Sequence, residues 1–370
     1  MARRLGFEPP TPHRRLLKVV LLILVTWVPL VLISLWHGHA WGLLREVPLL
    51  LDPVTYSRYL FVIPLLELAQ VFVEKSLGVQ TRHFLDSGLV PAQDRLRFES
   101  ARAEAISLRG SVVAEVLIAV LALTMSVLSR VVVNFGTSDS SWERLETTIT
   151  PAGWWNTLVS LPILFFFVLR WAWVFVLWAW FLSRVSRLDL ELTPTHPDRA
   201  GGLGFLGWSL ASFAIVLMAI SAVLSGGFAG EILFRGASLN TLKYHVMVFV
   251  VLAVVILHAP LLAFTGRLAR CRFQALLEFG TLISRHDRAF DEKWVKSETA
   301  KQENLLGSPD VASLAEIAQV FEHVDRMQLI PFDKKALVVL VVAALIPMIP
   351  LVGTAIPLTE IFSKLAELMV

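Results

Sequence analysis

The chain has 370 residues, of which 56% are hydrophobic and only 17% are charged, and its mean hydropathy is +0.67. A soluble domain does not have enough polar residues to cover this much apolar surface, so the composition excludes an ordinary soluble protein. The single cysteine, Cys271, excludes internal disulfides and four-cysteine zinc sites, and the formal net charge of +3 conceals an uneven distribution of basic residues.

Seven apolar runs of about 20 residues follow one another along the chain, each long enough for a helix to cross roughly 30 Å of hydrocarbon. The first run is longer than a signal-peptide core and no small-residue cleavage site follows it, so we predict a retained span. The runs lack the alternation of barrel strands, and in lipid the other structure that satisfies its backbone is the helix. We therefore predict an all-α, polytopic helical membrane protein with about seven transmembrane helices. The runs are Leu16–Trp36, Val54–Val73, Ser111–Phe135, Thr157–Leu182, Leu206–Gly226, His245–Gly266 and Ala336–Pro357.

The polar segments between the predicted spans are long enough to form structure of their own. Gln93–Arg109 and Arg267–Trp294 are rich in helix-forming residues, and Ser308-Pro309-Asp310 marks a further helix start with proline in its first turn. We therefore expect a cytoplasmic helical layer beneath the membrane bundle. The predicted regions are an N-terminal tail with spans one and two (1–73), a cytoplasmic helical segment (74–110), spans three to six (111–266) with a polar inner loop (183–205), a second cytoplasmic helical segment (267–335), and a proline-broken seventh span with an amphipathic C-terminal tail (336–370).

Lysine and arginine are distributed unevenly over the predicted loops, and positively charged loops resist translocation across a membrane. If the N-terminus is cytoplasmic, most of the 33 basic residues lie in cytoplasmic segments. The exterior segments then hold only Arg45, Arg58, Arg144, Arg235, Lys243 and Lys364. We therefore predict a cytoplasmic N-terminus.

Three stretches of the chain have distinctive sequences: Leu169–Trp173 (LRWAW), Ser183–Leu206 (SRVSRLDLELTPTHPDRAGGLGFL) and Ser308–Phe332 (SPDVASLAEIAQVFEHVDRMQLIPF). In order and spacing they resemble a family of uncharacterised bacterial multi-pass inner-membrane proteins, although together they cover only part of the chain. The resemblance implies a location in the bacterial inner membrane. It implies no activity and no functional residue, because none is established for that family.

Ionisable residues inside the predicted spans are the main functional signal, because a charge buried in lipid is costly unless it is paired or hydrated. Glu67, Arg170 and His258 lie equally far from the predicted outer ends of spans two, four and six, at a depth of about 20 Å. We expect an intramembrane charge cluster that serves as an ion pathway or gate. The alternative is a Glu–Arg pair that only fixes helix register, with His258 as a hydrogen-bonded core residue.

The loop from Thr193 to Gly202 (TPTHPDRAGG) is the densest polar motif in the chain. Its prolines and glycines fix an irregular backbone at the inner membrane face, where its polar side chains offer a site for a headgroup, an ion or a small ligand. The alternative is structural, with an aspartate that caps the next helix and an arginine that pairs locally. The polar members are Thr195, His196, Asp198 and Arg199.

Two further segments are candidates for a pore or gate. Pro347 and Pro350 interrupt the seventh span, which we expect to be kinked or re-entrant. Glu231 and Arg235 lie in an exterior Gly-rich segment, Gly226–Gly236, for which an ordinary surface loop is the alternative. The sequence contains no motif for nucleotide binding, zinc proteolysis, serine hydrolysis or nucleic-acid binding, so we expect no metal, no cofactor and no nucleic-acid partner.

These features favour a membrane transport protein, either an ion channel or an ion-coupled transporter, over an enzyme. A chain without visible internal repeats is expected to build a conduction path as a homo-oligomer around an axis, within the lipid bilayer. Two alternatives stay open. One is an inner-leaflet enzyme or a ligand or lipid sensor centred on the loop that contains His196, and the other is a membrane scaffold that handles no solute.

Overall fold

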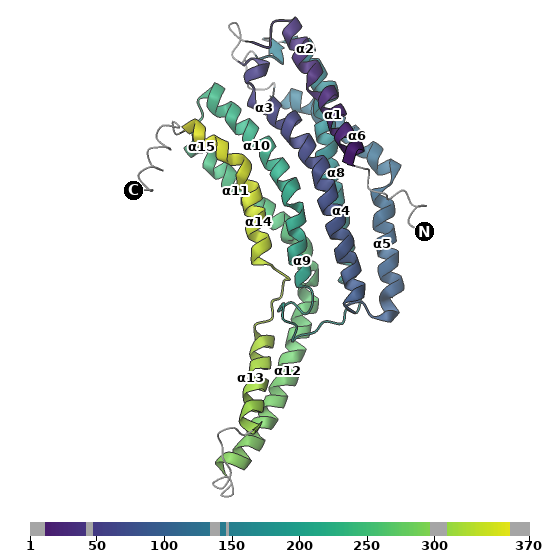
Figure 1. Ribbon diagram of the computed structural model, residues 1–370, viewed down its shortest axis with the longest axis vertical. Coiled ribbons are helices and arrows are strands. Elements are labelled where there is room, and N and C mark those ends of the chain that lie inside the picture. The colour runs from purple at the N-terminus through teal and green to yellow at the C-terminus, as the bar shows by residue number, and fades with distance from the viewer. Residues whose placement is uncertain (1–11, 42–46, 134–140, 146–147, 297–308, 356–370) are drawn as a thin grey trace.

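The computed structural model describes residues 12–41, 47–133, 141–145, 148–296 and 309–355, and these residues are almost entirely helical (Figure 1). The described part also contains a short antiparallel hairpin of β1 (Arg144–Leu145) and β2 (Thr148–Ile149). The predicted all-α, multi-pass class is confirmed, because six described helical stretches are long and apolar enough to cross a membrane. These stretches are His13–Trp36, Val112–Arg130, Pro151–Val185, Gly204–Arg235, Leu239–Val295 and Lys334–Gly353.

The N-terminal half of the chain forms helices whose breaks follow from the sequence. Pro29 lacks the N–H that would bond the carbonyl of Val25, and this carbonyl accepts a hydrogen bond from Trp155 Nε1 (3.2 Å) instead. Gly88, at φ +76°, follows the end of α4 and turns the chain back toward α5. The elements are α1 (Pro12–Thr26), α2 (Val28–Trp36), η2 (Leu49–Leu51), α3 (Pro53–Tyr56), η3 (Ser57–Val62), α4 (Ile63–Asp86), η4 (Ala92–Asp94), α5 (Arg95–Arg109), α6 (Val112–Val133), α7 (Pro151–Trp155), η5 (Asn156–Ser160) and α8 (Leu161–Val185).

The C-terminal half contains the longest helical run, 57 residues from Leu239 to Val295. Pro260 lies in a 3-10 segment within this run, where Leu261 and Phe264 are fully buried. The elements are α9 (Gly204–Ser209), η6 (Leu210–Phe213), α10 (Ala214–Arg235), α11 (Leu239–His258), η7 (Ala259–Phe264), α12 (Thr265–Phe290), η8 (Asp291–Val295), α13 (Pro309–Asp325), α14 (Lys334–Leu345), η10 (Ile346–Met348) and α15 (Ile349–Ala355).

The predicted second span, Val54–Val73, is also helical, although it is not one of the six stretches. It falls within the continuous run of α3, η3 and α4, which begins where Asp52 Oδ1 accepts a hydrogen bond from the Val54 N–H (3.0 Å). The run contacts α1, α8 and α10 within the bundle (Figure 1). One face of α4 is buried there, including Ile63 and Leu66.

The predicted exterior loop at Gly226–Gly236 is wrong, because α10 remains helical as far as Arg235 and ends only at Gly236, which has φ +67°. Gly226 instead allows two helices to approach closely. A Cβ built on it would lie 2.7 Å from the Cβ of Ser57, which is too short for a carbon–carbon contact.

The prolines of the last helix lie in a helical run that bends without folding back. α14 continues through the 3-10 turn η10 into α15, as expected for a kinked rather than a re-entrant span. Ser221 and Ser225 on α10 donate side-chain hydrogen bonds to the carbonyls of Ala344 and Pro347. These serines satisfy carbonyls in the proline-interrupted part of the helix, where the regular hydrogen-bond ladder is broken.

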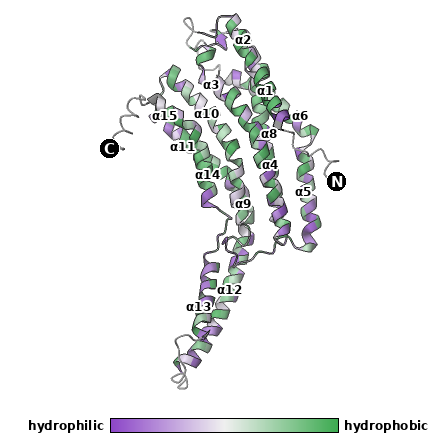
Figure 2. Cartoon of the chain, viewed as in Figure 1, coloured by the Kyte–Doolittle hydropathy of each residue, from purple (hydrophilic) through white to green (hydrophobic). Residues whose placement is uncertain are grey.

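α12 and α13 pair with each other and project beyond the bundle as a leg in which hydrophilic and hydrophobic residues are mixed (Figures 1 and 2). Arg272 on α12 forms an ion pair with Asp325 on α13 (3.1 Å). The expected helical segment at 267–335 is therefore a hairpin that stands away from the bundle. The polar segment at 74–110 is helical as well, since α4 extends into it and α5 packs back on α8.

Candidate functional site

Two π-helical segments face each other at the end of the bundle near the β-hairpin. η3 interrupts the run from α3 to α4, and η5 interrupts the run from α7 to α8. The hydroxyl of Tyr59 on η3 donates a hydrogen bond to Asn156 Oδ1 on η5, and each residue is only 1% exposed. π-helical turns are rare in proteins, and those that occur are often found at functional sites. The Tyr59–Asn156 pair is therefore a candidate functional site.

Asn156 connects this pair to a buried ion pair. Its Nδ2 donates to Glu143 Oε1 (2.6 Å), and the other oxygen of Glu143 pairs with the guanidinium of Arg130. Arg130 Nε also donates to Thr157 Oγ1 (2.8 Å). The side chains of Glu143 and Arg130 are each 19% exposed, so water screens their attraction little. We call Tyr59, Arg130, Glu143, Asn156 and Thr157 the hairpin network.

Hydrogen bonds and a close backbone approach hold the hairpin against the helices of the bundle. Thr150 Oγ1 accepts from the Gly153 N–H (3.0 Å) and donates to the carbonyl of Trp142 (2.7 Å). A Cβ on Gly153 would lie 2.2 Å from the carbonyl oxygen of Glu143, so glycine is required for this approach. Trp142 Nε1 in turn donates to Asp52 Oδ2 (3.0 Å) at the start of α3. These contacts hold Glu143 against the helices.

A second polar site lies further along α4 and α8. Glu67 is 7% exposed, and its Oε1 lies 3.3 Å from Lys18 Nζ on α1. Glu67 and Arg170 line the same cavity of about 20 Å³, although no direct ion pair joins them. Within the described residues Arg170 has no ion-pair or hydrogen-bond partner, so its guanidinium charge is not balanced by a carboxylate. We call Lys18, Glu67 and Arg170 the Glu67 cluster.

Further charges follow the Glu67 cluster along α4. Glu74 Oε1 accepts from Gln70 Nε2 (2.8 Å) and forms an ion pair with Arg109 of α5. Gln70 and Arg109 also line the cavity of Glu67 and Arg170. Side chains from α1, α4, α5 and α8 therefore converge on one polar region.

His258 lies elsewhere. α11 begins at Leu239, and His258 is its last residue, directly before η7. Its Nδ1 bonds the carbonyl of Val254 (2.8 Å), and its ring centroid lies 5.5 Å from that of Phe332. The structure thus brings Glu67 and Arg170 to one cavity and leaves His258 outside it.

The loop of residues 193–203 is shaped by Asp198. Its Oδ1 accepts from the N–H groups of Ala200 (2.8 Å) and Gly202 (3.2 Å), and its Oδ2 accepts from that of Gly204 (2.7 Å). Burial raises the pKa of Asp198, but these three backbone donors outweigh that effect and hold the pKa below its usual range. Asp198 therefore closes the loop and satisfies the N–H of Gly204, the first residue of α9.

The same loop joins the bundle to the base of the leg. The carbonyl of Arg199, whose backbone is left-handed at φ +54°, accepts from the Gln328 N–H (2.7 Å), and the carbonyl of His196 bonds His323 Nε2 (2.9 Å). The side chains of Thr195, His196 and Arg199 are exposed. These contacts are structural, and the exposed side chains do not converge on a common cavity.

The remaining predicted positions lie away from both polar sites. Glu231 and Arg235 form an ion pair one helical turn apart on α10, and both side chains are exposed. Pro347 is half-buried and Pro350 is exposed on the last helix. Neither pair lines a described cavity together with the Glu67 cluster or the hairpin network.

The sequence signals for the two sites differ in strength. Glu67 and Arg170 stand out because each is a charge inside an apolar run. Within the hairpin network only Arg130 has that signal, whereas Glu143 lies outside every predicted span and its partner Asn156 is an ordinary polar residue. Comparisons of the chain with protein-family models, curated proteins and solved structures found no match.

Proposed function

We propose that the chain is a membrane transport protein, an ion-coupled transporter or ion channel, in which the interface of α1, α4 and α8 forms the path. The supporting observation is that two polar sites meet the same two helical runs: Tyr59 and Asn156 of the hairpin network, and Glu67 and Arg170 of the Glu67 cluster, lie on the runs that end in α4 and α8. Tyr59 of the hairpin network and Glu67 lie on one continuous helical run, about 12 Å apart along its axis at 1.5 Å per residue. Polar and ionisable groups inside a membrane bundle are typical of ion pathways.

Polar groups also lie between the two sites. Ser160 on η5 donates a hydrogen bond to the carbonyl of Thr26 on α1 (2.7 Å), and both residues are fully buried. Ser160 follows Asn156 by one helical turn, on the run that leads to Arg170. Buried hydroxyls of this kind support a polar track between the hairpin network and the Glu67 cluster.

The Glu67 cluster is the proposed coupling element. A transported cation competes with the Lys18 ammonium for the carboxylate of Glu67, and the guanidinium of Arg170 attracts an anion. The cavity of about 20 Å³ has room for about one water molecule, so the described conformation is closed to a hydrated ion. We propose that opening requires helix movement within a homo-oligomer, in a bacterial inner membrane with the N-terminus in the cytoplasm.

An enzyme or sensor centred on the 193–203 loop has less support, because backbone N–H groups occupy both carboxylate oxygens of Asp198. A pure scaffold gives no role to Arg170, which is half-buried and has no ion-pair partner within the described residues.

Ion flux into proteoliposomes that contain the purified full chain tests the proposal. Glu67→Gln keeps the size of the side chain and an acceptor for Lys18, and it is expected to lower flux at least about tenfold, as is Arg170→Gln. Glu231→Gln removes one partner of an exposed ion pair and serves as the control, with flux expected to be unchanged. The proposal fails if wild-type vesicles pass none of H⁺, Na⁺, K⁺ and Cl⁻, or if Glu67→Gln retains wild-type flux.

A further inference from the structure

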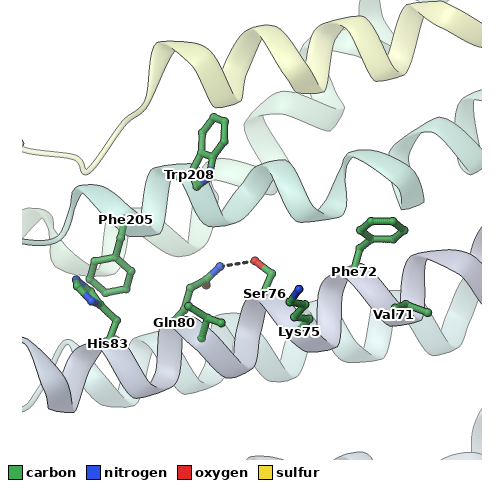
Figure 3. Close-up of a pocket in the computed structure, with 9 residues that line it drawn as sticks. Val71, Phe72, Lys75, Ser76, Gln80, His83, Phe205 and Trp208 are labelled. Carbon is green, nitrogen blue, oxygen red and sulfur yellow. Dashed lines mark hydrogen bonds between the residues drawn. The ribbon is translucent and has the colours of Figure 1, made fainter. Parts of the chain in front are cut away.

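A groove of about 510 Å³ lies between α4 and α9, away from the two ionic sites (Figure 3). Its volume is within the range of small-molecule sites. The walls are mainly apolar and aromatic. α4 contributes Val71, Phe72 and Val79, and the α9 side contributes Phe205 and Trp208.

One polar side chain in the groove is buried and incompletely bonded. Gln80 is 6% exposed, and its Nε2 donates to Ser76 Oγ (2.8 Å), which Figure 3 shows as the dashed line. Its Oε1 has no partner among the described residues. A buried acceptor without a donor costs free energy, so this position favours a ligand that brings an O–H or N–H group.

The charged groups in the groove are all basic. Lys75 is exposed and has no ion-pair partner within the described part of the chain, and His83 lies at the same end as Phe205, with ring centroids 4.5 Å apart. No acidic residue lines the groove. The groove therefore favours an anion at Lys75, which lies between Phe72 and Gln80 along α4 (Figure 3).

The residues that line the groove also change from apolar to basic along α4. Val71 and Phe72 fall inside the predicted span Val54–Val73, whereas Lys75 to His83 lie beyond it. An apolar section at hydrocarbon depth followed by a basic section at headgroup depth matches an amphiphile that belongs to the bilayer.

We propose that this groove binds an anionic phospholipid whose headgroup carries a hydroxyl, such as phosphatidylglycerol. Its acyl chain packs on Val71 and Phe72, its phosphate lies at Lys75, and its headgroup hydroxyl donates to Gln80 Oε1. A phosphate diester has no proton to give to that oxygen, so the hydroxyl is the feature that Gln80 selects. The proposal does not depend on the transport function.

Native mass spectrometry of the detergent-purified full chain, titrated with single lipids, tests this site. Phosphatidylglycerol is expected to bind at least about tenfold more tightly than phosphatidylcholine, which is zwitterionic, and more tightly than phosphatidylmethanol, which has the same charge but no headgroup hydroxyl. Lys75→Gln and the groove-filling Val79→Trp are expected to weaken phosphatidylglycerol binding about tenfold each. Gln80→Leu is expected to remove the preference over phosphatidylmethanol.

Arg82→Gln is the matched control, because Arg82 is an exposed basic residue of α4 that does not line the groove, and this variant is expected to bind like the wild type. The proposal is overturned if Lys75→Gln and Val79→Trp bind phosphatidylglycerol like the wild type, or if Arg82→Gln loses as much affinity as Lys75→Gln. It is also overturned if Val79→Cys forms disulfide-linked dimers in native membranes, because a second copy of the chain then occupies the groove. Val79 is 61% exposed, so both of its substitutions are compatible with folding.

Discussion

Replacing Asp198 with alanine is expected to lower the free energy of unfolding by about 3 kcal/mol. The carboxylate accepts three backbone N–H bonds of 2.7 to 3.2 Å, and each is worth about 1 kcal/mol. Asp198→Asn keeps one acceptor oxygen, so it is expected to cost about half as much. Asp325→Ala, which removes an exposed partner of Arg272 on the leg, is the control and is expected to change stability by less than about 0.5 kcal/mol.

The pH dependence gives this prediction a second readout. Because the pKa of Asp198 is lowered in the folded chain, its contribution is fully present above the unfolded value of about 3.9 and declines as the pH falls through the lower folded pKa. The stability gap between wild type and Asp198→Ala should therefore narrow below about pH 4. Thermal unfolding in detergent, followed by tryptophan fluorescence from pH 3 to 7, measures it. An equal gap at both ends of this range, or an Asp198→Ala variant as stable as the wild type, would refute the reasoning.

The remaining predictions use the same thermal assay. Gly204→Ala is expected to destabilise the chain, because the new Cβ would lie 2.8 Å from the Cβ of Asp198, whereas Gly227→Ala has no atom within 4 Å and is expected to be neutral or stabilising. Ser221→Ala removes the donor to the Ala344 carbonyl and is expected to cost about 1 kcal/mol, whereas Ser284→Ala, on the exposed leg, should cost little. Tyr59→Phe is expected to cost about 1 to 3 kcal/mol by leaving Asn156 unsatisfied, and Tyr244→Phe, which is 61% exposed, is its control. If a variant and its control have equal melting temperatures, the contact assigned to that variant does not stabilise the fold.

The fold class was predictable because hydropathy is a local property that accumulates over about 20 residues. The ends of helices were less predictable. A glycine near the end of an apolar run usually indicates a loop, yet α10 continues past Gly226. Glycine is needed there because Ser57, from a helix distant in sequence, packs against its Cα. Such a contact has no local sequence signal.

The candidate sites also differ in how much of each could be predicted from the sequence. The placement of Glu67 beside Arg170 agrees with counting residues along two helices. The same count does not bring His258 to their cavity, because depth along a helix does not determine which helices lie next to it. The hairpin network could not be derived, since Tyr59 and Asn156 are 97 residues apart and neither π-helical segment has a sequence signature. Gln80 likewise reads as a surface glutamine until its burial is known.

The 57-residue helix that crosses from the bundle into the leg has a mechanical consequence. At 1.5 Å per residue it is a rod of about 85 Å, and its proline-containing segment η7 is clamped by the fully buried side chains of Leu261 and Phe264. Because α11 and α12 belong to one helical run held at η7, a displacement of α12 is expected to tilt α11 as well.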